Sequence, residues 1–455
     1  MCEHCEIAAQ VILLQDRVRQ LEERNVDLEA ENAQLRERIA ELEQKGSGSS
    51  ASSSSSGFWK ANRPQRAKDT PRKKRTHNAA RKRGTPTQRV VHAVDHCRRC
   101  GCRLQGGSVK RTREVLHIPI VPVEVIEHVF IERQCPLCGQ REVSGPEVLV
   151  GEVIGQCRVS VQTMAMIATL REVGRLPVAT IQWLLETWHG LHLSRGEVVE
   201  ILHKVAGQAG EFVAEIKKEL RTSPVVHGDE TTWREDGQNG YFWVFCTPTM
   251  RYFVHRHSRS GDVVLETLGE DFEGVLVTDF YAAYSRLLGR HQRCWAHLLR
   301  AVHELGEKHP QDEQLAAWAK AVQALYTEAC SYGQKDGNAP AKERRRAQEQ
   351  FEQRLLELCR PHLSRDAPQT VLCQRVERFL PELFVFVADP RVPPDNNAAE
   401  RAIRPLAVSR KISGGTRAPW GTETKSVLAI LFGTWKLRGL DPFSACRELL
   451  LSPQV

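Results

Sequence analysis

Two short apolar runs in the middle of the chain each end in an aspartate, Pro224–Asp229 and Val275–Asp279. Between them lie two further runs rich in aromatic and β-branched residues, 241–247 and 251–255, and then a helical stretch at 262–268. This order predicts a strand, a hairpin, a helix and a second acid-ending strand. A single aspartate after a strand is commonly a turn residue. Two at neighbouring strand ends repel each other unless a cation lies between them, so the pattern favours a divalent metal site.

The layout is that of an α/β sheet of the ribonuclease H-like type, and the site needs a third acid from later in the chain. Glu400 is the candidate, because Asp395-Asn-Asn is typical of an Asx cap before a helical turn. Glu400 and Arg404 would share one face of that turn, which Pro405 is expected to limit. The alternative is an ordinary surface ion pair between Glu400 and Arg404.

A long stretch of chain separates the second acid from the third. The 120 residues between Asp279 and Glu400 are too many for a loop. Residues 311–383 are rich in charged residues and glutamine, in a pattern typical of helices. We therefore expect an inserted helical subdomain, which clamps DNA ends or simply packs beside the catalytic sheet.

Four spaced motifs carry a resemblance to a known family. They are His227-Gly-Asp-Glu-Thr-Thr-Trp, Val277-Thr-Asp-Phe-Tyr-Ala-Ala-Tyr, Cys294-Trp-Ala-His and Asp395-Asn-Asn-Ala-Ala-Glu-Arg-Ala-Ile-Arg-Pro. In wording and order they resemble the motifs of the DDE transposases of the IS66 insertion-sequence family. The resemblance implies that Asp229, Asp279 and Glu400 form a catalytic triad that binds two Mg²⁺ or Mn²⁺ ions. It also implies that Cys294 and His297 belong to an accessory motif beside the active site.

The implied activity is metal-dependent cleavage and strand transfer at the ends of an insertion sequence. The implied partners are terminal inverted repeats, target DNA and accessory proteins of the same element. The chemistry fits the residues, since in-line attack on phosphorus needs metal-held oxygens and no nucleophilic side chain. Two alternatives use the same motifs: a catalytically inactive DNA-binding protein derived from such an enzyme, and a nuclease that acts on hybrids of RNA and DNA.

The N-terminal 45 residues contain a heptad repeat. Leucine recurs every seven residues from Leu14 to Leu42, and two of the other seam positions hold Asn25 and Asn32. Residues that would face each other across a parallel dimer, such as Arg17 and Glu22, have opposite charges. The pattern predicts a leucine-zipper coiled coil that makes the chain a homodimer through residues 8–45. The alternative is an amphipathic helix packed on its own domain.

A basic arm follows a flexible Ser/Gly tether at 46–57. Residues 60–83 hold eleven Lys or Arg and one acid, so their charge of +10 exceeds the +8 of the whole chain. We expect the arm to bind DNA, with a solvated linker as the alternative. The loop 414–421 and the basic residues before it are further candidates, with a surface turn as the alternative. The predicted DNA contacts are Arg72, Lys73, Lys74, Arg75, Arg81, Lys82, Arg83, Arg404, Arg410 and Lys411.

Two Cys-x-x-Cys pairs are separated by 34 residues. They are Cys97 with Cys100, and Cys135 with Cys138. In a reducing cytosol such pairs hold metal more often than they form disulfides. Strand-like apolar runs at 116–120 and 123–131 lie between them. The spacing therefore predicts a zinc ribbon in which four thiolates bind one structural Zn²⁺.

From 159 to 220 the pattern is helical, with Ser194 as an N-cap and Glu197 at the capping-box position. The pair of helices is compatible with a helix-turn-helix, but structural packing of a helical hairpin predicts the same pattern and is favoured. No apolar run approaches the roughly 20 residues of a membrane span. We therefore expect a bacterial cytoplasmic protein associated with the nucleoid and not with the membrane.

Together these patterns predict a multidomain α/β chain. The expected order is a leucine-zipper coiled coil at 1–45, a Ser-rich linker and basic arm at 46–88, a zinc-binding module at 89–150, a helical domain at 151–222, the first part of a ribonuclease H-like core at 223–306, a helical insertion at 307–393, and the completion of the core with C-terminal helices at 394–455.

Overall fold

The computed structural model describes residues 85–145, 149, 151–335, 339–364 and 367–452. The predicted coiled coil at 8–45, the Ser/Gly tether and the basic arm residues Arg72 to Arg83 lie outside the described residues. Residues up to Leu116 and residues from His117 onward belong to two separate units.

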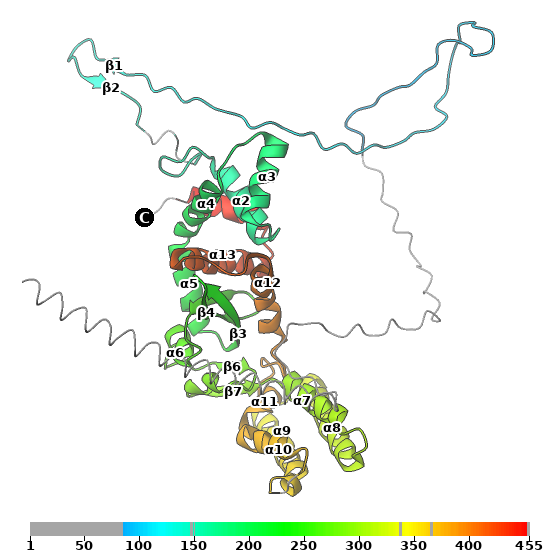
Figure 1. The fold of residues 1–455 in the computed structure, drawn as a ribbon, viewed down its shortest axis with the longest axis vertical. Coiled ribbons are helices and arrows are strands. Elements are labelled where there is room, and N and C mark those ends of the chain that lie inside the picture. Colours follow the sequence, from blue (N-terminus) through cyan, green and yellow to red (C-terminus); the bar gives the residue numbers. More distant parts are fainter. Residues whose placement is uncertain (1–84, 146–148, 150, 336–338, 365–366, 453–455) are drawn as a thin grey trace, which may run out of the picture. The chain divides into compact units, whose positions relative to one another are not determined.

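A mixed five-stranded sheet forms the centre of the larger unit, with the strand order β5-β4-β3-β6-β7 (Figure 1). The strands are β3 (Val225–Glu235), β4 (Gln238–Cys246), β5 (Arg251–Arg256), β6 (Val275–Thr278) and β7 (Arg290–Arg293). β3, β4 and β5 are antiparallel neighbours, whereas β6 runs parallel to both β3 and β7. The predicted hairpin and the predicted pairing of the two acid-bearing strands are both confirmed.

The sheet packs between helices on both faces. Helix α5 (Gly210–Arg221), α6 (Asp262–Leu268) and α12 (Asn397–Ser413) share one apolar core with it, together with the 3₁₀ turn η2 (Ala282–Arg286). Because successive side chains of a strand alternate between faces, Asp229 shares a face with its cross-strand neighbour Val244. Helix α12 contacts β3 and β4, which brings a late segment of the chain next to Asp229.

The helices expected between 311 and 383 are present, and two further helices, α7 (Trp295–Lys308) and α11 (Val385–Ala388), flank them. The expected helices are α8 (Glu313–Lys335), α9 (Ala341–Cys359) and α10 (Thr370–Arg378), with the 3₁₀ turns η3 (Arg360–His362) and η4 (Leu380–Glu382). Their apolar faces form a second core that includes Val275 and Val277 of β6. The insertion is therefore packed against the sheet rather than attached only by its ends.

A third core unites the helices that precede the sheet with the end of the chain. It contains α2 (Val161–Glu172), α3 (Val178–His189), α4 (Arg195–Gly207), α13 (Pro419–Leu437) and α14 (Pro442–Leu451). The predicted capping box is confirmed, since Ser194 Oγ accepts from the Glu197 amide at 3.1 Å and the Ser194 amide donates to Glu197 at 2.7 Å. A buried ion pair of 2.7 Å between Lys425 and Glu172 joins α13 to α2. These contacts support the packing interpretation of the helical hairpin.

Two expectations about element ends are wrong. Strand β3 does not stop at Asp229 but continues to Glu235, because its antiparallel pairing with β4 extends beyond its parallel pairing with β6. Pro405 does not limit its helix, since α12 continues through it to Ser413. Pro405 lacks an amide hydrogen and its ring crowds the carbonyl one turn earlier, but packing of the apolar face of α12 on the sheet outweighs this cost.

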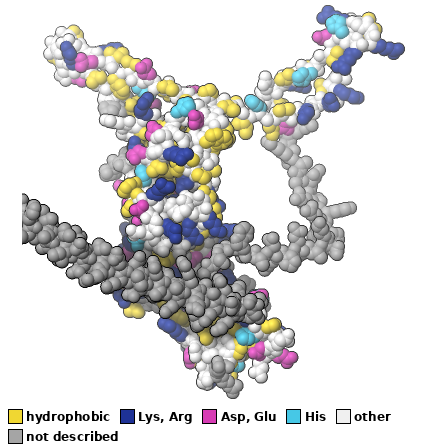
Figure 2. Space-filling model, viewed as in Figure 1, with side chains coloured by type: hydrophobic (Ala, Val, Ile, Leu, Met, Phe, Trp, Pro, Cys, Tyr) yellow, Lys and Arg dark blue, Asp and Glu magenta, His cyan; other side chains and the backbone are white. Residues whose placement is uncertain are grey.

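The segment between the two cysteine pairs differs from the sequence expectation. The strands expected at 116–120 and 123–131 are absent, and only the two-residue strands β1 (Arg133–Gln134) and β2 (Arg141–Glu142) form. The Val123 amide instead donates to the carbonyl of His189 at the end of α3. Hydrophobic side chains therefore lie on the surface of the segment that leads to β1 and β2 (Figure 2). Val125, for example, is 92% exposed. A strand needs a hydrogen-bonding partner, which apolar alternation alone does not supply.

Among the helices that the structure describes, none combines the length and the apolar character that crossing a bilayer requires.

Candidate active site

Three carboxylates from three distant elements approach one another at one face of the sheet. Asp229 lies within β3, Asp279 directly follows β6, and Glu400 lies in the first turn of α12. The pKa of Asp229 is raised from 3.8 to about 7, chiefly by burial and in addition by the negative charges of Glu230, Asp279 and Glu400. The fold therefore places Asp279 and Glu400 within electrostatic reach of Asp229.

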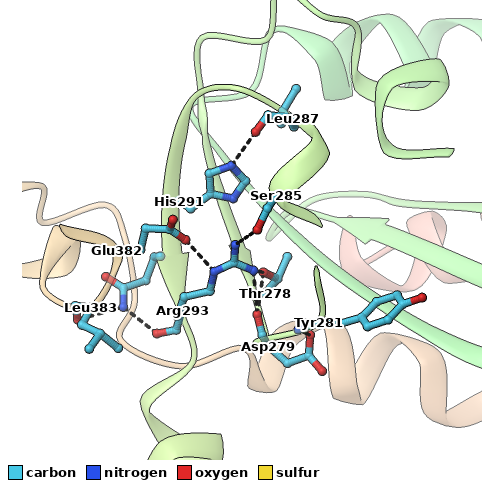
Figure 3. A network of polar contacts seen from close by, with 10 residues as sticks. Thr278, Asp279, Tyr281, Ser285, Leu287, His291, Arg293, Glu382 and Leu383 are labelled. Carbon is cyan, nitrogen blue, oxygen red and sulfur yellow. Dashed lines mark hydrogen bonds and ion pairs between the residues drawn. The ribbon is translucent and has the colours of Figure 1, made fainter. Parts of the chain in front are cut away.

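The backbone around Asp279 is fixed by a fully buried arginine from β7 (Figure 3). Arg293 donates from Nη1 to the Asp279 carbonyl at 2.9 Å and to the Thr278 hydroxyl at 3.1 Å. Its charge is balanced by Glu382 of the insertion, at 2.5 Å from Nε. The Asp279 carboxylate also accepts from the Tyr281 amide at 2.9 Å, which closes a turn directly after the strand. The position of Asp279 is thus set jointly by the sheet and the insertion.

Glu400 faces His297 of the predicted accessory motif. His297 Nε2 lies 3.8 Å from Glu400 Oε1, and helix α7 supplies the histidine at its start. Both Glu400 Oε1 and His297 Nδ1 are buried atoms without a hydrogen-bond partner among the described residues. No ion pair between Glu400 and Arg404 forms within the described chain, so the surface ion-pair alternative is wrong. Unsatisfied buried polar atoms of this kind are expected where a ligand or ion binds.

Asn396 connects the start of helix α12 to strand β3 and to the start of helix α7. It is 1% exposed and precedes α12. Its Nδ2 donates to the Gly228 carbonyl at 2.7 Å, and its Oδ1 accepts from His227 Nδ1 at 3.0 Å, so it binds two adjacent residues of β3. Its own amide donates to the Cys294 thiol at 3.2 Å. Burial raises the pKa of Cys294, which keeps the thiol protonated and available as a packing and hydrogen-bonding group.

Comparison with known proteins identifies the family. A family model described as "Transposase IS66 family" matches residues 156–424, which is more than half of the chain. The chain belongs to the IS66 family of transposases. The matched range includes all three acids and the Cys294–His297 motif, but neither cysteine pair. This confirms the family that the four sequence motifs indicated.

Two relatives of this IS66-family chain come from Sinorhizobium fredii (strain NBRC 101917 / NGR234). The uncharacterized protein y4qI is 24% identical over 293 residues, which cover 57% of this chain and 53% of that protein. The uncharacterized protein y4jD is 28% identical over 225 residues, covering 46% of this chain and 43% of the other. The chain thus spans about half the length of the curated relatives it matches.

Of the predicted DNA contacts that the structure describes, Arg404 and Lys411 are exposed on α12. Arg410 is half-buried and its guanidinium donates to the Thr231 hydroxyl at 3.0 Å and to the Thr232 carbonyl at 2.5 Å. It therefore fastens the end of α12 to β3 in this IS66-family chain.

The loop after α12 is also held by β3. The Thr416 amide donates to the Arg234 carbonyl and the Asp236 amide donates to the Thr416 carbonyl, each at 2.9 Å. Gly415 has a φ of +131°, and a Cβ there would lie 2.2 Å from the Arg234 carbonyl oxygen, so only glycine fits. These contacts favour the turn interpretation for the backbone of 414–416, while Arg417 next to it is exposed.

Each cysteine pair forms the same local turn. In the smaller unit the Cys97 amide donates to the Cys102 carbonyl and Gly101 donates back to Cys97, each at 2.9 Å. In the larger unit the Cys135 amide donates to Gln140 at 2.7 Å and Gly139 to Cys135 at 2.9 Å. Gly101 and Gly139 have left-handed φ values of 74° and 76°. Backbone hydrogen bonds lower the pKa of Cys97 and of Cys135, which favours the thiolates that bind metal.

No group of three or more His, Cys, Asp or Glu side chains within the described part of the chain is already gathered around one point as a metal site. Asp279 and Glu400 act on the charge of Asp229, but the three carboxylates do not meet at a single point.

Sequence reasoning missed two supports of the site. One is Asn396, read only as part of a helix cap. The other is Glu230, whose side chain is 4% exposed and which accepts from the Tyr284 hydroxyl at 2.5 Å and pairs with Arg259. The only signal was the placement of Glu230 directly after Asp229, which puts it on the opposite face of the strand.

Proposed function

We propose that this IS66-family chain is a DNA transposase that cleaves phosphodiesters at the ends of an insertion sequence and transfers the strands. Its catalytic residues are Asp229, Asp279 and Glu400. The observation that carries the proposal is the placement of Asp279, after β6, and Glu400, on α12, within electrostatic reach of Asp229 on β3, whose pKa is raised to about 7 chiefly by burial and also by both of these carboxylates. Two acids from distant positions in the chain add their charge to that of a buried third acid, an arrangement typical of functional sites.

The sheet supports a ribonuclease H-like core. The strand order is β5-β4-β3-β6-β7. β3, β4 and β5 are antiparallel neighbours, and β6 and β7 extend the sheet in parallel from β3. Asp229 lies on the central strand β3, Asp279 directly follows the neighbouring strand β6, and Glu400 lies on a helix after the insertion.

The donor set fits two Mg²⁺ or Mn²⁺ ions. Carboxylate oxygens are the ligands that these ions prefer. Glu400 Oε1 is buried without a hydrogen-bond partner in the described chain, and Asp229 is charged only against the repulsion of its neighbours. Asp229, Asp279 and Glu400 would hold the ions, which activate the attacking oxygen and stabilise the leaving oxygen of the phosphodiester.

The remaining residues of the site position these acids. Asn396 fixes the start of α12, and hence Glu400, against the strand that carries Asp229. Arg293 holds the backbone of Asp279 and is itself held by Glu382. His297, at the start of α7, faces Glu400 through Nε2 at 3.8 Å.

The proposal extends to the parts outside the family match. The paired turns at Cys97/Cys100 and Cys135/Cys138 would bind one structural Zn²⁺, and the basic arm with Arg404 and Lys411 would bind the terminal inverted repeats and target DNA. A homodimer through residues 8–45 would hold two element ends together, with accessory proteins of the element as further partners. The chain would act in the bacterial cytoplasm, at the nucleoid.

The test is a nicking and strand-transfer assay on duplexes that carry the ends of the element, with Mg²⁺ or Mn²⁺ added. Asp229→Asn and Glu400→Gln should reduce product by about 10³-fold or more, as expected when a transition-state contact is removed. Glu304→Gln is the matched control, since Glu304 is an exposed carboxylate on the neighbouring helix α7.

Three outcomes separate the alternatives. Undiminished activity in both acid variants would refute the assignment of the triad. Salt-sensitive DNA binding without any metal-dependent cleavage by the wild type would indicate a catalytically inactive DNA-binding protein instead. Cleavage of RNA in RNA–DNA hybrids, without dependence on element ends, would indicate the hybrid nuclease.

A further inference from the structure

A cavity of about 480 Å³ adjoins the candidate active site. One wall is catalytic and includes Asp279, Phe280 and His297. The other wall comes from the helical insertion, chiefly from α10. A ligand in this cavity would therefore touch both the acid-bearing loop and the insertion.

A single face of α10 lines the cavity. The residues that it contributes are Val371, Gln374, Arg375 and Arg378. Their spacing of three, four and seven residues places them on one side of the helix. The other side of α10 is buried in the core of the insertion through Leu372, Cys373 and Val376. The helix cannot rotate without exposing that core, so the orientation of the lining face is fixed.

The two arginines of this face have no carboxylate partner. Neither Arg375 nor Arg378 forms an ion pair with any Asp or Glu of the described chain, whereas Arg293 nearby is paired with Glu382. Arg375 lies 5.5 Å from the ring centroid of Phe280, and Arg378 lies 5.2 Å from that of Phe379. Stacking on a ring orients a guanidinium while leaving its N–H edge free for an anion.

We infer that the cavity binds one nucleotide of an unpaired DNA strand next to the phosphodiester that is cut. Arg375 and Arg378 take its phosphate, and Val371 with Phe280 contacts its sugar or base. The volume lies within the ~300–1,000 Å³ of sites for single small ligands, so a strand must leave the duplex to enter. Two guanidinium groups beside a site that cuts DNA are best suited to bind a phosphate, because each can donate two parallel hydrogen bonds to it. The inference rests on the proposed function and assigns the insertion a direct part in it.

The first test compares DNA binding by full-length variants through fluorescence anisotropy, in buffer without divalent ions so that cleavage does not interfere. The probes are fluorescein-labelled oligothymidylate and a blunt hairpin duplex. The double variant Arg375→Ala/Arg378→Ala should bind oligothymidylate about tenfold more weakly, with a salt slope shallower by about 0.7, the contribution of one lost phosphate contact on a single strand. Its binding of the blunt duplex should change less.

The matched control is Arg345→Ala/Arg346→Ala. These two arginines are exposed on α9 of the same insertion and do not line the cavity, and their removal changes the net charge by the same amount. A comparable melting temperature for both double variants shows that the insertion remains folded.

The second test locates the strand by disulfide trapping. Gln374→Cys lies on the cavity face, whereas Glu377→Cys is exposed elsewhere on the same helix. An oligothymidylate with an activated disulfide tether on one phosphate should react faster with Gln374→Cys than with wild type, and Glu377→Cys should show no such gain.

Equal weakening by the two double variants, or equal trapping at 374 and 377, would overturn the subsite while leaving the proposed function intact. If the wild type binds neither oligonucleotide, the proposed function and the subsite are both refuted.

Discussion

At the scale of single residues, Asp229 shows how neighbours decide what a side chain does. Burial is the first cause of its raised pKa, and the carboxylates of Glu230, Asp279 and Glu400 add to it. The charged form is therefore unfavourable until a cation compensates it. The same residue in an exposed turn would be an ordinary ionised aspartate.

The pH dependence of stability follows from that shift. The folded pKa is about 7 and the ordinary value is 3.8, so the folded state holds the proton more tightly. The associated stability is fully present below about pH 4 and is lost as the pH rises through about 7. Asp229→Asn should therefore be more stable than wild type at about pH 8, by the order of 4 kcal/mol at about 1.4 kcal/mol per pKa unit, and gain little at about pH 4.

Thermal unfolding across this pH range without divalent ions measures the effect, with the exposed Asp271→Asn as control. Addition of Mg²⁺ should raise the melting temperature of the wild type more than that of Asp229→Asn. A melting-temperature difference between Asp229→Asn and wild type that does not vary with pH would contradict the raised pKa.

Asn396 carries the second prediction at this scale. Asn396→Ala leaves the Gly228 carbonyl and His227 without their buried partner, so it should cost about 2 kcal/mol of unfolding free energy. Because Glu400 loses its anchor, kcat should fall more than KM rises.

Asn397→Ala is the control for Asn396→Ala. Asn397 is the next residue, and its side chain makes no hydrogen bond within the described chain. Denaturant unfolding and strand-transfer kinetics test both variants. An equal loss of activity in the two would show that Asn396 is not a special anchor.

At the scale of elements, the two cysteine turns illustrate how little sequence is needed to form a turn of defined geometry. In each, a left-handed glycine after the second cysteine allows the chain to fold back, and the hydrogen bonds follow the same pattern in both. The apolar segment between the two turns forms no strand at 116–131, and its hydrophobic side chains are exposed.

Zinc content tests this element. Wild type should contain one more Zn²⁺ per chain than Cys100→Ser or Cys138→Ser, since loss of one of four thiolates opens the tetrahedral site. Cys102→Ser is the control, because Cys102 is exposed and contributes only its carbonyl to the turn. Equal zinc content in all four proteins would refute the site.

At the scale of the whole molecule, late segments complete early ones. Helix α12 supplies the third acid to a sheet whose strands lie well over a hundred residues earlier, and α13 packs on β5 and on the helical domain before the sheet. The insertion contributes Glu382 to the support of Asp279. The candidate site therefore depends on contacts between elements that lie far apart in the sequence.

The oligomeric state is the prediction at this scale. Leu28→Lys in the heptad seam of the full chain should convert a dimer into a monomer, because a buried lysine at the seam opposes its own copy. Ala30→Lys adds the same charge on the outer surface of the zipper and should leave the dimer intact. Light scattering after size exclusion distinguishes the two, and a dimer that persists in Leu28→Lys would refute the zipper.

The sequence by itself determined the local elements and the chemistry-bearing residues. Alternation and helical periodicity placed the strands at Val225 and Val275 and the capping box at Ser194, because these depend on neighbours along the chain. The motifs around Asp229, Asp279 and Glu400 identified the family and the order of the acids.

Only the tertiary structure decided how these residues meet. Contacts between residues far apart in sequence decided three points. They let α12 continue through Pro405, and they turn Glu400 toward His297 instead of Arg404. They also bind Arg410 to β3. The same holds for the α10 face opposite Asp279. Packing free energy is summed over the whole core, so it outweighs the local preferences that a sequence pattern reports.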